Sequence, residues 1–164
     1  MTTARVVEAG VDDVADILAF IRDLAKFEKL EREVAATERS LRETLFGPRK
    51  YAEVVFAEAE GERVGFAIFF HNYSTFLGRP DLYLEDLYVR PDKRGLGYGK
   101  LLFRHLAGLA VARGCGRLEW QVLDWNRGAI DFYRSLGAEP MSDWTVYRLS
   151  GDALQRLASP AAAD

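Results

Sequence analysis

The chain has 164 residues, enough for one domain with a real core, and its 49% hydrophobic and 29% charged residues are typical of a soluble globular protein. A net charge of -3 argues against a nucleic-acid-binding surface, because phosphate contacts need clustered lysines and arginines. Cys115, the only cysteine, cannot form an intramolecular disulfide, and we find no signal peptide and no membrane-length apolar run, so we expect a cytoplasmic protein.

The N-terminal half of the sequence alternates between strand and helix patterns. Residues 4–9 predict a short strand, and apolar residues recur at helical spacing from 12 to about 27. A second helix is expected around 38–46, where Thr37 is in position to cap it. The next patterns predict a hairpin around Glu60-Gly61, then a loop and a further strand, over residues 51–71, 72–81 and 82–89.

The C-terminal half begins with alternate glycines between residues 95 and 99, directly after the strand pattern. They open an amphipathic helix that runs to about Arg113, and Gly114 is its expected C-terminal cap. Residues after about 158 are expected to fray. Without repeats or linkers, residues 1–164 are expected to form a single α/β domain. Its remaining elements are a strand, a short capped helix and a last strand, at 116–125, 126–137 and 143–151.

The glycine segment matches neither of the common nucleotide-binding loops. A Walker A loop needs Gly-Lys followed by Ser or Thr, whereas Leu101 follows Gly99-Lys100, and a dinucleotide fingerprint needs glycine at position 100. Even so, glycines between a strand and a helix let backbone N–H groups converge at the helix N-terminus, where the helix dipole favours a pyrophosphate. The alternative is a tight turn that needs glycine only for its dihedral angles.

The stretch from Arg94 to Gly99 matches the Arg/Gln-x-x-Gly-x-Gly/Ala signature of the GNAT superfamily of acetyltransferases. The similarity extends over roughly residues 4–150. The segments LAKFEKLE, VGFAIFF, YLEDLYV, DWN and FYRSLGA together resemble the branch of diamine (spermidine/spermine) and thialysine acetyltransferases. This resemblance implies an α/β protein with the GNAT fold, in which a mixed, twisted and mostly antiparallel β-sheet has helices on both faces. It also implies acetyl-CoA as co-substrate, no metal, and a homodimer.

The resemblance further assigns residues to the coenzyme. Backbone amides of residues 95–100 would cradle its pyrophosphate, and the end of the preceding strand would pair with its pantetheine arm. A backbone amide there would polarise the thioester carbonyl, as in an oxyanion hole. Asn126 would contact the coenzyme, cap its own helix, or do both. The expected cofactor-binding residues are Leu87, Tyr88, Val89, Arg94, Gly95, Leu96, Gly97, Tyr98, Gly99, Lys100, Asn126, Arg127, Gly128, Ala129 and Tyr133.

Two residues are candidates for the proton transfers. Tyr133 shares a helical face with apolar residues, which favours a core role, whereas the resemblance implies that it protonates the departing thiolate. Glu85 has apolar strand neighbours, where a carboxylate is costly to bury without a partner. It either forms a salt bridge to a neighbouring strand or, as the resemblance implies, attracts the ammonium substrate and takes its proton. Asp86 is the weaker choice, because alternation places it with Leu84 and Tyr88 on the face that should pack against helices.

The acceptor site is also assigned by resemblance. The polyamine enzymes typically carry tyrosine where this chain has Phe27, so one hydroxyl is missing. They carry an acidic residue at the position of Thr145, and this departure weakens the polyamine assignment while leaving fold and cofactor untouched. The expected acceptor-lining residues, besides Glu85, are Phe27, Glu28, Glu119, Trp120 and Gln121.

These features together predict an N-acetyltransferase that moves acetyl from acetyl-CoA to the primary amine of a small cationic molecule. A diamine, a polyamine or a thialysine-like amino acid would accept it by direct transfer in a ternary complex. One alternative is acetylation of a protein N-terminus or of an antibiotic amine. Another is a non-catalytic module that senses acyl-CoA, and the retention of Glu85 and Tyr133 disfavours this module. Packing or solvated roles, rather than places in a catalytic triad, are expected for Cys115, His71 and His105. Neither nucleic acid nor membrane is an expected partner.

Overall fold

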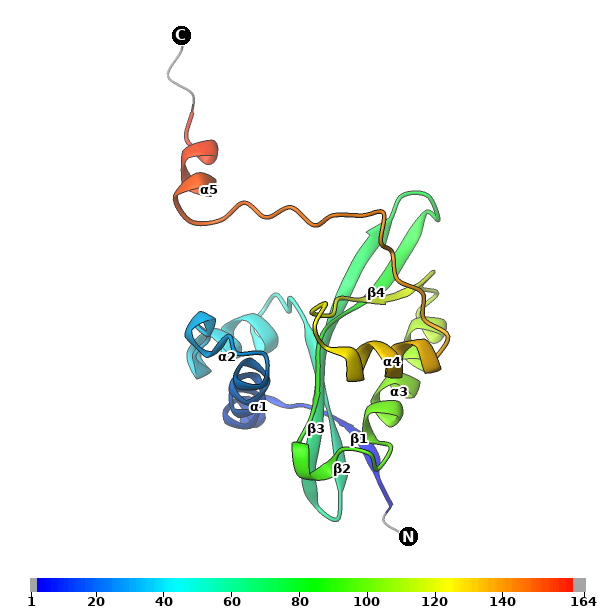
Figure 1. The fold of residues 1–164 in the computed structure, drawn as a ribbon. Helices are drawn as coiled ribbons and strands as arrows, with labels where there is room; N and C mark the ends of the chain where they lie inside the picture. The colour runs from blue at the N-terminus through cyan, green and yellow to red at the C-terminus, as the bar shows by residue number, and fades with distance from the viewer. Residues whose placement is uncertain (1–2, 161–164) are drawn as a thin grey trace. The chain divides into compact units, whose positions relative to one another are not determined.

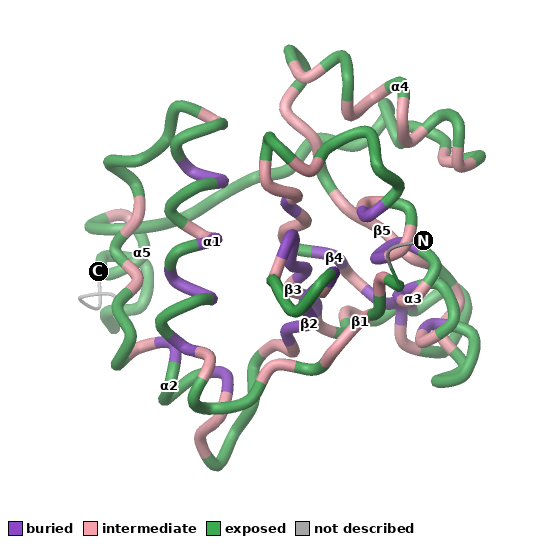
Figure 2. Tube along the Cα trace, turned by 90° about the horizontal axis from the view of Figure 1, so that it is seen from below, coloured by how far each residue is buried: buried purple, intermediate pink, exposed green. Residues whose placement is uncertain are grey.

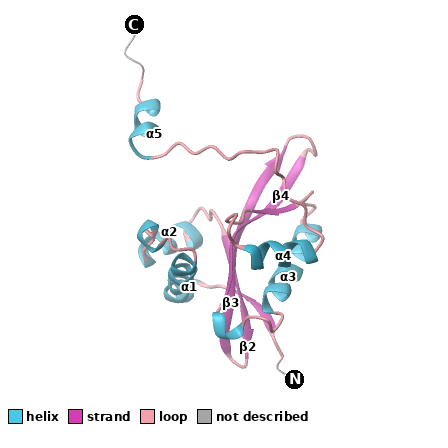
Figure 3. Ribbon diagram, in the orientation of Figure 1, coloured by secondary structure: helices cyan, strands magenta, loops and turns pink. Residues whose placement is uncertain are grey.

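The computed structural model describes residues 3–160, and the chain forms two compact units, one up to Gln121 and one from Val122 onward. The first unit contains all the strands of the described chain, and the second contains two helices (Figures 1 and 3). The elements of the first unit are β1 (Arg5–Glu8), α1 (Val14–Phe27), α2 (Glu38–Phe46), β2 (Glu53–Ala59), β3 (Glu62–Ser74), β4 (Arg79–Val89), α3 (Tyr98–Ala112) and β5 (Leu118–Trp120). Those of the second unit are α4 (Arg127–Ser135) and α5 (Gly151–Ala158).

The sheet of the first unit has the strand order β1-β2-β3-β4-β5. Strands β1 to β4 pair antiparallel in sequence order, and β5 is parallel to β4. The prediction of a mixed, mostly antiparallel sheet is therefore confirmed. A parallel last strand needs a crossover connection, and α3 provides it on one face of the sheet.

Two turns define the long central hairpins. Glu60 and Gly61 both adopt positive φ, +53° and +78°, which confirms the predicted hairpin between β2 and β3. The loop predicted over 72–81 is wrong, because β3 continues to Ser74 and β4 already starts at Arg79. The Ser74 side chain accepts a hydrogen bond from the N–H of Leu77 at 3.2 Å, so a tighter turn replaces the loop.

The core consists of two apolar layers, one on each face of the sheet (Figure 2). Helices α1 and α2 cover one face, where the ring of Phe20 stacks on that of Phe66 at 5.2 Å between centroids. Helix α3 covers the other face with the stripe predicted from its spacing, and all four residues are buried: Leu102, Phe103, Leu106 and Ala110. Helix α2 begins at the predicted position, with the Thr37 side chain accepting from the N–H of Ser40 at 3.1 Å.

The second unit departs most from the sequence patterns. A last strand was predicted over residues 143–151, but residues 143–150 belong to no helix or strand, and α5 begins at Gly151. A strand requires a partner for its backbone groups, and none pairs with this segment among residues 3–160. The strand predicted over 116–125 is also shorter, since β5 spans Leu118–Trp120. Part of the C-terminal stretch that was predicted to fray, residues 161–164, lies outside the described residues.

No helix within residues 3–160 has both the length and the apolar character needed to span a membrane.

Candidate active site

The turn between β4 and α3 has the backbone geometry of an anion site. Gly95 and Gly97 adopt left-handed φ angles of +76° and +89°, which other residues rarely take. Gly97 is the N-cap of α3 and has no side chain to accept from the first turn, whose N–H groups lack acceptors within the helix. A Cβ atom built on either glycine would meet nothing within 4 Å, so the space outside this turn is open. These exposed N–H groups can therefore bind a phosphate group.

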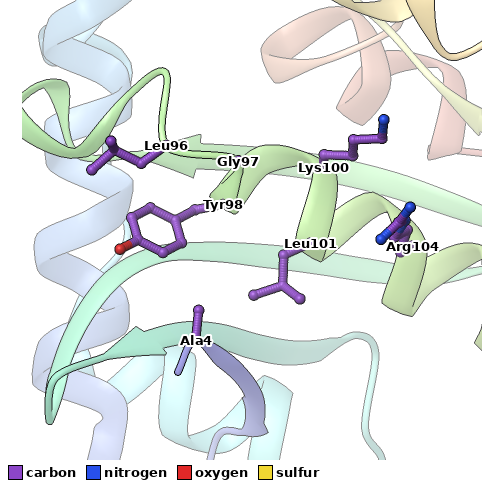
Figure 4. A pocket seen from close by; sticks show the side chains of 7 residues that line it. All are labelled: Ala4, Leu96, Gly97, Tyr98, Lys100, Leu101 and Arg104. Carbon is purple, nitrogen blue, oxygen red and sulfur yellow. The ribbon is translucent and has the colours of Figure 1, made fainter. Parts of the chain in front are cut away.

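A hollow of about 570 Å³ lies beside this turn (Figure 4). Two cations, Lys100 and Arg104, come from successive turns of α3 and add full positive charge to the helix N-terminus. Tyr98 is buried, so of this residue only the backbone N–H is available to an anion in the turn. The residues that line the hollow are Ala4, Leu96, Gly97, Tyr98, Lys100, Leu101 and Arg104.

Strand β4 offers a free backbone edge next to the glycine turn. Its parallel ladder with β5 ends at the pair Leu84–Trp120, and within residues 3–160 no strand pairs with the same edge of residues 85–89. On the other edge residues 86–89 pair with β3, where a Cβ on Gly65 would come within 2.8 Å of the Tyr88 carbonyl oxygen. An extended ligand can pair with the free edge as an added strand does.

A β-bulge in β4 determines where its two acidic residues point. Ile68 of β3 pairs with Asp86 and Phe69 pairs with Leu84, which leaves Glu85 as the extra residue. The predicted alternation, with Leu84 and Asp86 on one face, is therefore wrong. Asp86 shares the α1/α2 face of the sheet with Ile68, whereas Glu85 is exposed.

The carboxyl group of Asp86 is strongly perturbed. Burial raises its pKa to about 6, with further contributions from the negative charges of Glu85 and Glu28. Burial also raises the pKa of Glu28, which lies at the C-terminal end of α1. Within residues 3–160, no cation forms an ion pair with Glu28, Glu85 or Asp86. This cluster of three carboxyl groups is suited to a cationic ligand.

Next to this cluster lie Tyr83 and Glu119, whose carboxylate is 3.7 Å from Nε of Arg117. They are partners in the β4–β5 ladder, so their side chains lie on the same side of the sheet. Burial and the charges of Glu85, Glu119 and Asp86 raise the pKa of Tyr83. Trp120, the next residue of β5, lies on the opposite face, where its ring meets that of Phe103 at 4.9 Å between centroids.

Arg94 lies between the glycine turn and the end of α1. Its Nε donates to the carbonyl oxygen of Val89 at 3.0 Å. Its guanidinium carbon lies 4.6 Å from the ring centroid of Phe27 and 5.2 Å from that of Tyr88. The side chain predicted to flank the pyrophosphate thus already contacts three groups of the protein.

The comparisons with known proteins agree with this geometry. The Acetyltransferase (GNAT) family matches residues 18–138, which include β4, the glycine turn and α4. This chain is a GNAT acetyltransferase.

Two relatives and one solved structure are examples of the proteins to which this chain is similar. The thialysine N-epsilon-acetyltransferase of Mus musculus is 37% identical over 169 residues, which cover 96% of this chain and 99% of the mouse protein. The L-ornithine N5-acetyltransferase of Arabidopsis thaliana is 45% identical over 112 residues, 68% of this chain and 46% of the plant protein. An integron cassette protein of V. cholerae superposes with a TM-score of 0.80 at 26% identity and covers 96% of this chain and 98% of its own.

The second unit of this GNAT chain contains the other predicted site residues. The side chain of Asn126 caps α4 by accepting from the N–H of Ala129 at 3.2 Å, which confirms its capping role. Arg127 and Gly128 complete the first turn of this helix. Tyr133 lies one and a half turns further along, half-buried, with its ring 5.9 Å from that of Phe132.

Sequence reasoning ranked Asp86 below Glu85, and the reason is structural. Strict alternation cannot reveal a bulge, so Asp86 was grouped with Leu84. The available signal was the pair of adjacent carboxylates in one strand. A bulge can change the direction of neighbouring side chains, so either carboxylate could be the one that faces the site. Of the residues set aside from catalysis, Cys115 is a half-buried free thiol. Residues 3–160 contain no group of three or more His, Cys, Asp or Glu arranged to hold a metal ion.

Proposed function

We propose that this protein transfers acetyl from acetyl-CoA directly to the primary amine of a small cationic molecule in a ternary complex. The observation that carries the proposal is an acidic cluster in which Glu85 and Asp86 come from the strand that leads to the glycine turn and Glu28 comes from the end of α1, with no ion-paired cation among residues 3–160. A site for an ammonium group thus lies near a site for a phosphate. Family membership supports the transfer of an acetyl group between the two.

The residues of the first unit fit acetyl-CoA, which GNAT acetyltransferases use and which supplies the activated acetyl group when bound. The N–H groups of residues 95–100 would hold its pyrophosphate, with Lys100 adding charge. The free edge at Leu87 to Val89 would pair with the pantetheine arm, and an N–H there would donate to the thioester oxygen. The first turn of α4, residues 126–129, would add further contacts.

We propose that Asp86 and Glu85 divide the work at the amine. Asp86 is the better base, because a carboxyl group with a pKa of about 6 accepts a proton more readily than an ordinary one while staying largely ionised at neutral pH. It would take the proton of the ammonium, directly or through water. Glu85, exposed beside it, would attract the cation and favour its approach. Glu28 and Glu119 would contact the remaining charges of the substrate.

Tyr133 is proposed as the acid that returns a proton to the departing thiolate. Its place in the family match and the amphipathic α4 that carries it support this role. No covalent intermediate on the protein is needed. The base takes the first proton of the ammonium and later releases it to solvent. The second proton, which the nitrogen loses as the amide forms, goes to the tyrosinate that is left when Tyr133 protonates the thiolate.

For the acceptor we propose a short amine, such as thialysine, ornithine or a small diamine. The names of the relatives support this class. A second argument is Thr145, since this chain has no carboxylate where the polyamine enzymes have one. We also retain the predictions of a homodimer in the cytoplasm.

The decisive experiment is a panel of amines incubated with acetyl-CoA, followed by thiol release and by mass spectrometry of the products. Acetylation of short diamines or basic amino acids would support the proposal. Binding of acetyl-CoA without thiol release above the uncatalysed rate would favour the non-catalytic module. Acetylation confined to peptides or aminoglycosides would favour the alternative acceptors.

A further inference from the structure

We propose that Arg94 is a positioning residue for the amine site, through which the glycine turn holds the acceptor wall in place. The inference rests on the proposed function, because it takes Phe27 and Glu28 as part of that wall. Signature arginines beside a phosphate loop suggest a contact with the phosphate. The contacts of Arg94 in this protein point elsewhere.

Three groups of the protein hold the guanidinium of Arg94. Its Nε donates to the Val89 carbonyl oxygen at 3.0 Å, which fixes it to the last residue of β4. Its carbon lies 4.6 Å from the Phe27 ring centroid and 5.2 Å from that of Tyr88. Both distances are within the range of a cation–π contact. One side chain therefore links the residue before the glycine turn, the end of β4 and the end of α1.

Each aromatic ring is close in sequence to a carboxyl group of the acidic cluster. Phe27 is followed directly by Glu28, and Tyr88 lies two residues after Asp86. Tyr88 itself is buried and lies edge-on to Phe20 of α1, at 6.4 Å between centroids, so its ring is already fixed. Phe27 is 37% exposed at the C-terminal end of α1, so burial fixes its ring less than that of Tyr88, and the guanidinium of Arg94 is one of its contacts. Arg94 thus sets the position of Glu28 relative to Asp86.

The interaction of Glu28 with Asp86 is electrostatic, so it depends on where the end of α1 lies. The charge of Glu28 contributes to the raised pKa of Asp86, and the two carboxyl groups can therefore attract the same ammonium ion. A displaced α1 terminus would weaken the binding of the amine and leave the N–H groups of the glycine turn unchanged. This separation of the two substrates is what a test can measure.

Arg94→Lys is the informative substitution, because lysine keeps the positive charge but loses the planar group that stacks on two rings and donates through Nε. We expect it to raise the KM of the amine roughly five- to thirty-fold, the combined loss of a stacked cation and one hydrogen bond. The acetyl-CoA dissociation constant, measured by calorimetry, should stay within about threefold. Phe27→Leu should raise the same KM, and the double variant should be no worse than the poorer single one. Arg42→Ala, an exposed arginine of α2, is the matched control and should change neither constant.

Two outcomes would overturn the inference. One is an Arg94→Lys enzyme whose KM for the amine stays at the wild-type value, whether or not its affinity for acetyl-CoA falls. The other is a strictly additive effect of Arg94→Lys and Phe27→Leu. Should the wild-type protein acetylate no amine, the proposed function fails by itself. The link between Arg94 and Phe27 is then still decided by the same double-mutant cycle in urea unfolding, with an expected coupling of roughly two- to fivefold in the unfolding constant.

Discussion

The glycine turn and the acidic bulge lie within a dozen residues of each other, yet they build their sites from different parts of the residue. The turn uses backbone N–H groups, and its geometry is set by Gly95 and Gly97 at φ angles of +76° and +89°. The bulge uses side chains, and its geometry is set by one extra residue in β4 opposite β3. The geometry of a backbone site depends little on the neighbouring side chains, whereas a site made of side chains depends on strand register, burial and nearby charge.

The two regions also differ in how much they cost the stability of the fold. Glycines in a turn cost little, because no side chain is strained and the exposed N–H groups remain hydrated. The acidic cluster is costly, because burial and two neighbouring negative charges disfavour the ionised form of Asp86. Such an arrangement is kept where the charge has a function. The following experiments separate the two regions, beginning with the largest expected effect.

Asp86→Asn and Glu85→Gln test the division of work at the bulge. We expect Asp86→Asn to lower kcat/KM roughly 10²–10⁴-fold, the usual effect of removing a general base. Glu85→Gln should cost only about tenfold or less, because an exposed charge contributes modestly. Both variants should bind acetyl-CoA as the wild type does in calorimetry. A larger loss for Glu85→Gln would show that the exposed carboxylate is the base and that burial of Asp86 has another cause.

The length of the amine tests the compactness of the acidic cluster. Glu28 and Glu85 both act electrostatically on Asp86, so this cluster suits one or two nearby ammonium groups rather than the four spread along spermine. We expect kcat/KM for a short diamine or ornithine to exceed that for spermine by roughly ten- to a hundredfold, the value of one charge-assisted contact. A monoamine of equal length is the control for chain length alone. Spermine as the best substrate would contradict the argument from Thr145.

Gly97→Ala, compared with Gly108→Ala, tests the backbone site. Gly97 has a φ of +89°, so a Cβ there costs about 1–2 kcal/mol unless the turn changes. A changed turn should weaken acetyl-CoA about tenfold, with the KM of the amine little altered. Gly108 lies inside α3 with open space around it, and alanine there should stabilise the helix by roughly 0.5–1 kcal/mol. Unchanged acetyl-CoA affinity for Gly97→Ala would exclude a role of this turn in binding it.

The contrast between a backbone site and a side-chain site also explains how much of each region could be predicted from the sequence. The glycine spacing predicted the turn and the helix after it, because positive φ angles and a strand-to-helix turn are local properties, whereas the anion site stays a prediction. The position of Asp86 could not be predicted, because a bulge depends on how β3 and β4 pair across the hairpin. The contacts of Arg94 were missed for a similar reason, since Phe27 is 67 residues away in the sequence.

The second unit shows what a local sequence pattern can predict and what it cannot. Asn126 and the bounds of α4 were predicted well, since capping residues and amphipathic spacing are sufficient for a short helix. A last strand was predicted over residues 143–151, but a local pattern does not identify a pairing partner, and the predicted strand is not formed.

The smallest expected effect concerns stability, and its sign follows from the raised pKa of Asp86. An unfolded aspartate titrates near 3.9, whereas in the folded protein the pKa is about 6. Between these values the folded state binds more protons than the unfolded state, so the free energy of unfolding falls as pH rises from about 4 to 6 and stays lowered above that range. Asp86→Asn removes this pH-dependent loss in the free energy of unfolding. We expect it to stabilise the protein by about 1–2 kcal/mol at pH 7 and by much less at pH 4, measured by urea unfolding.

Arg42→Ala is again a suitable control, because its exposed side chain should affect stability little at either pH. A stabilised but inactive Asp86→Asn variant would show that the acidic bulge is kept for its chemistry at a cost to the fold. The glycine turn should give the opposite result, since Gly97→Ala loses stability and affinity together. An Asp86→Asn variant that is less stable at pH 7 than the wild type would mean that the carboxylate has a partner in the folded protein, and the proposal of an unpaired base would fail.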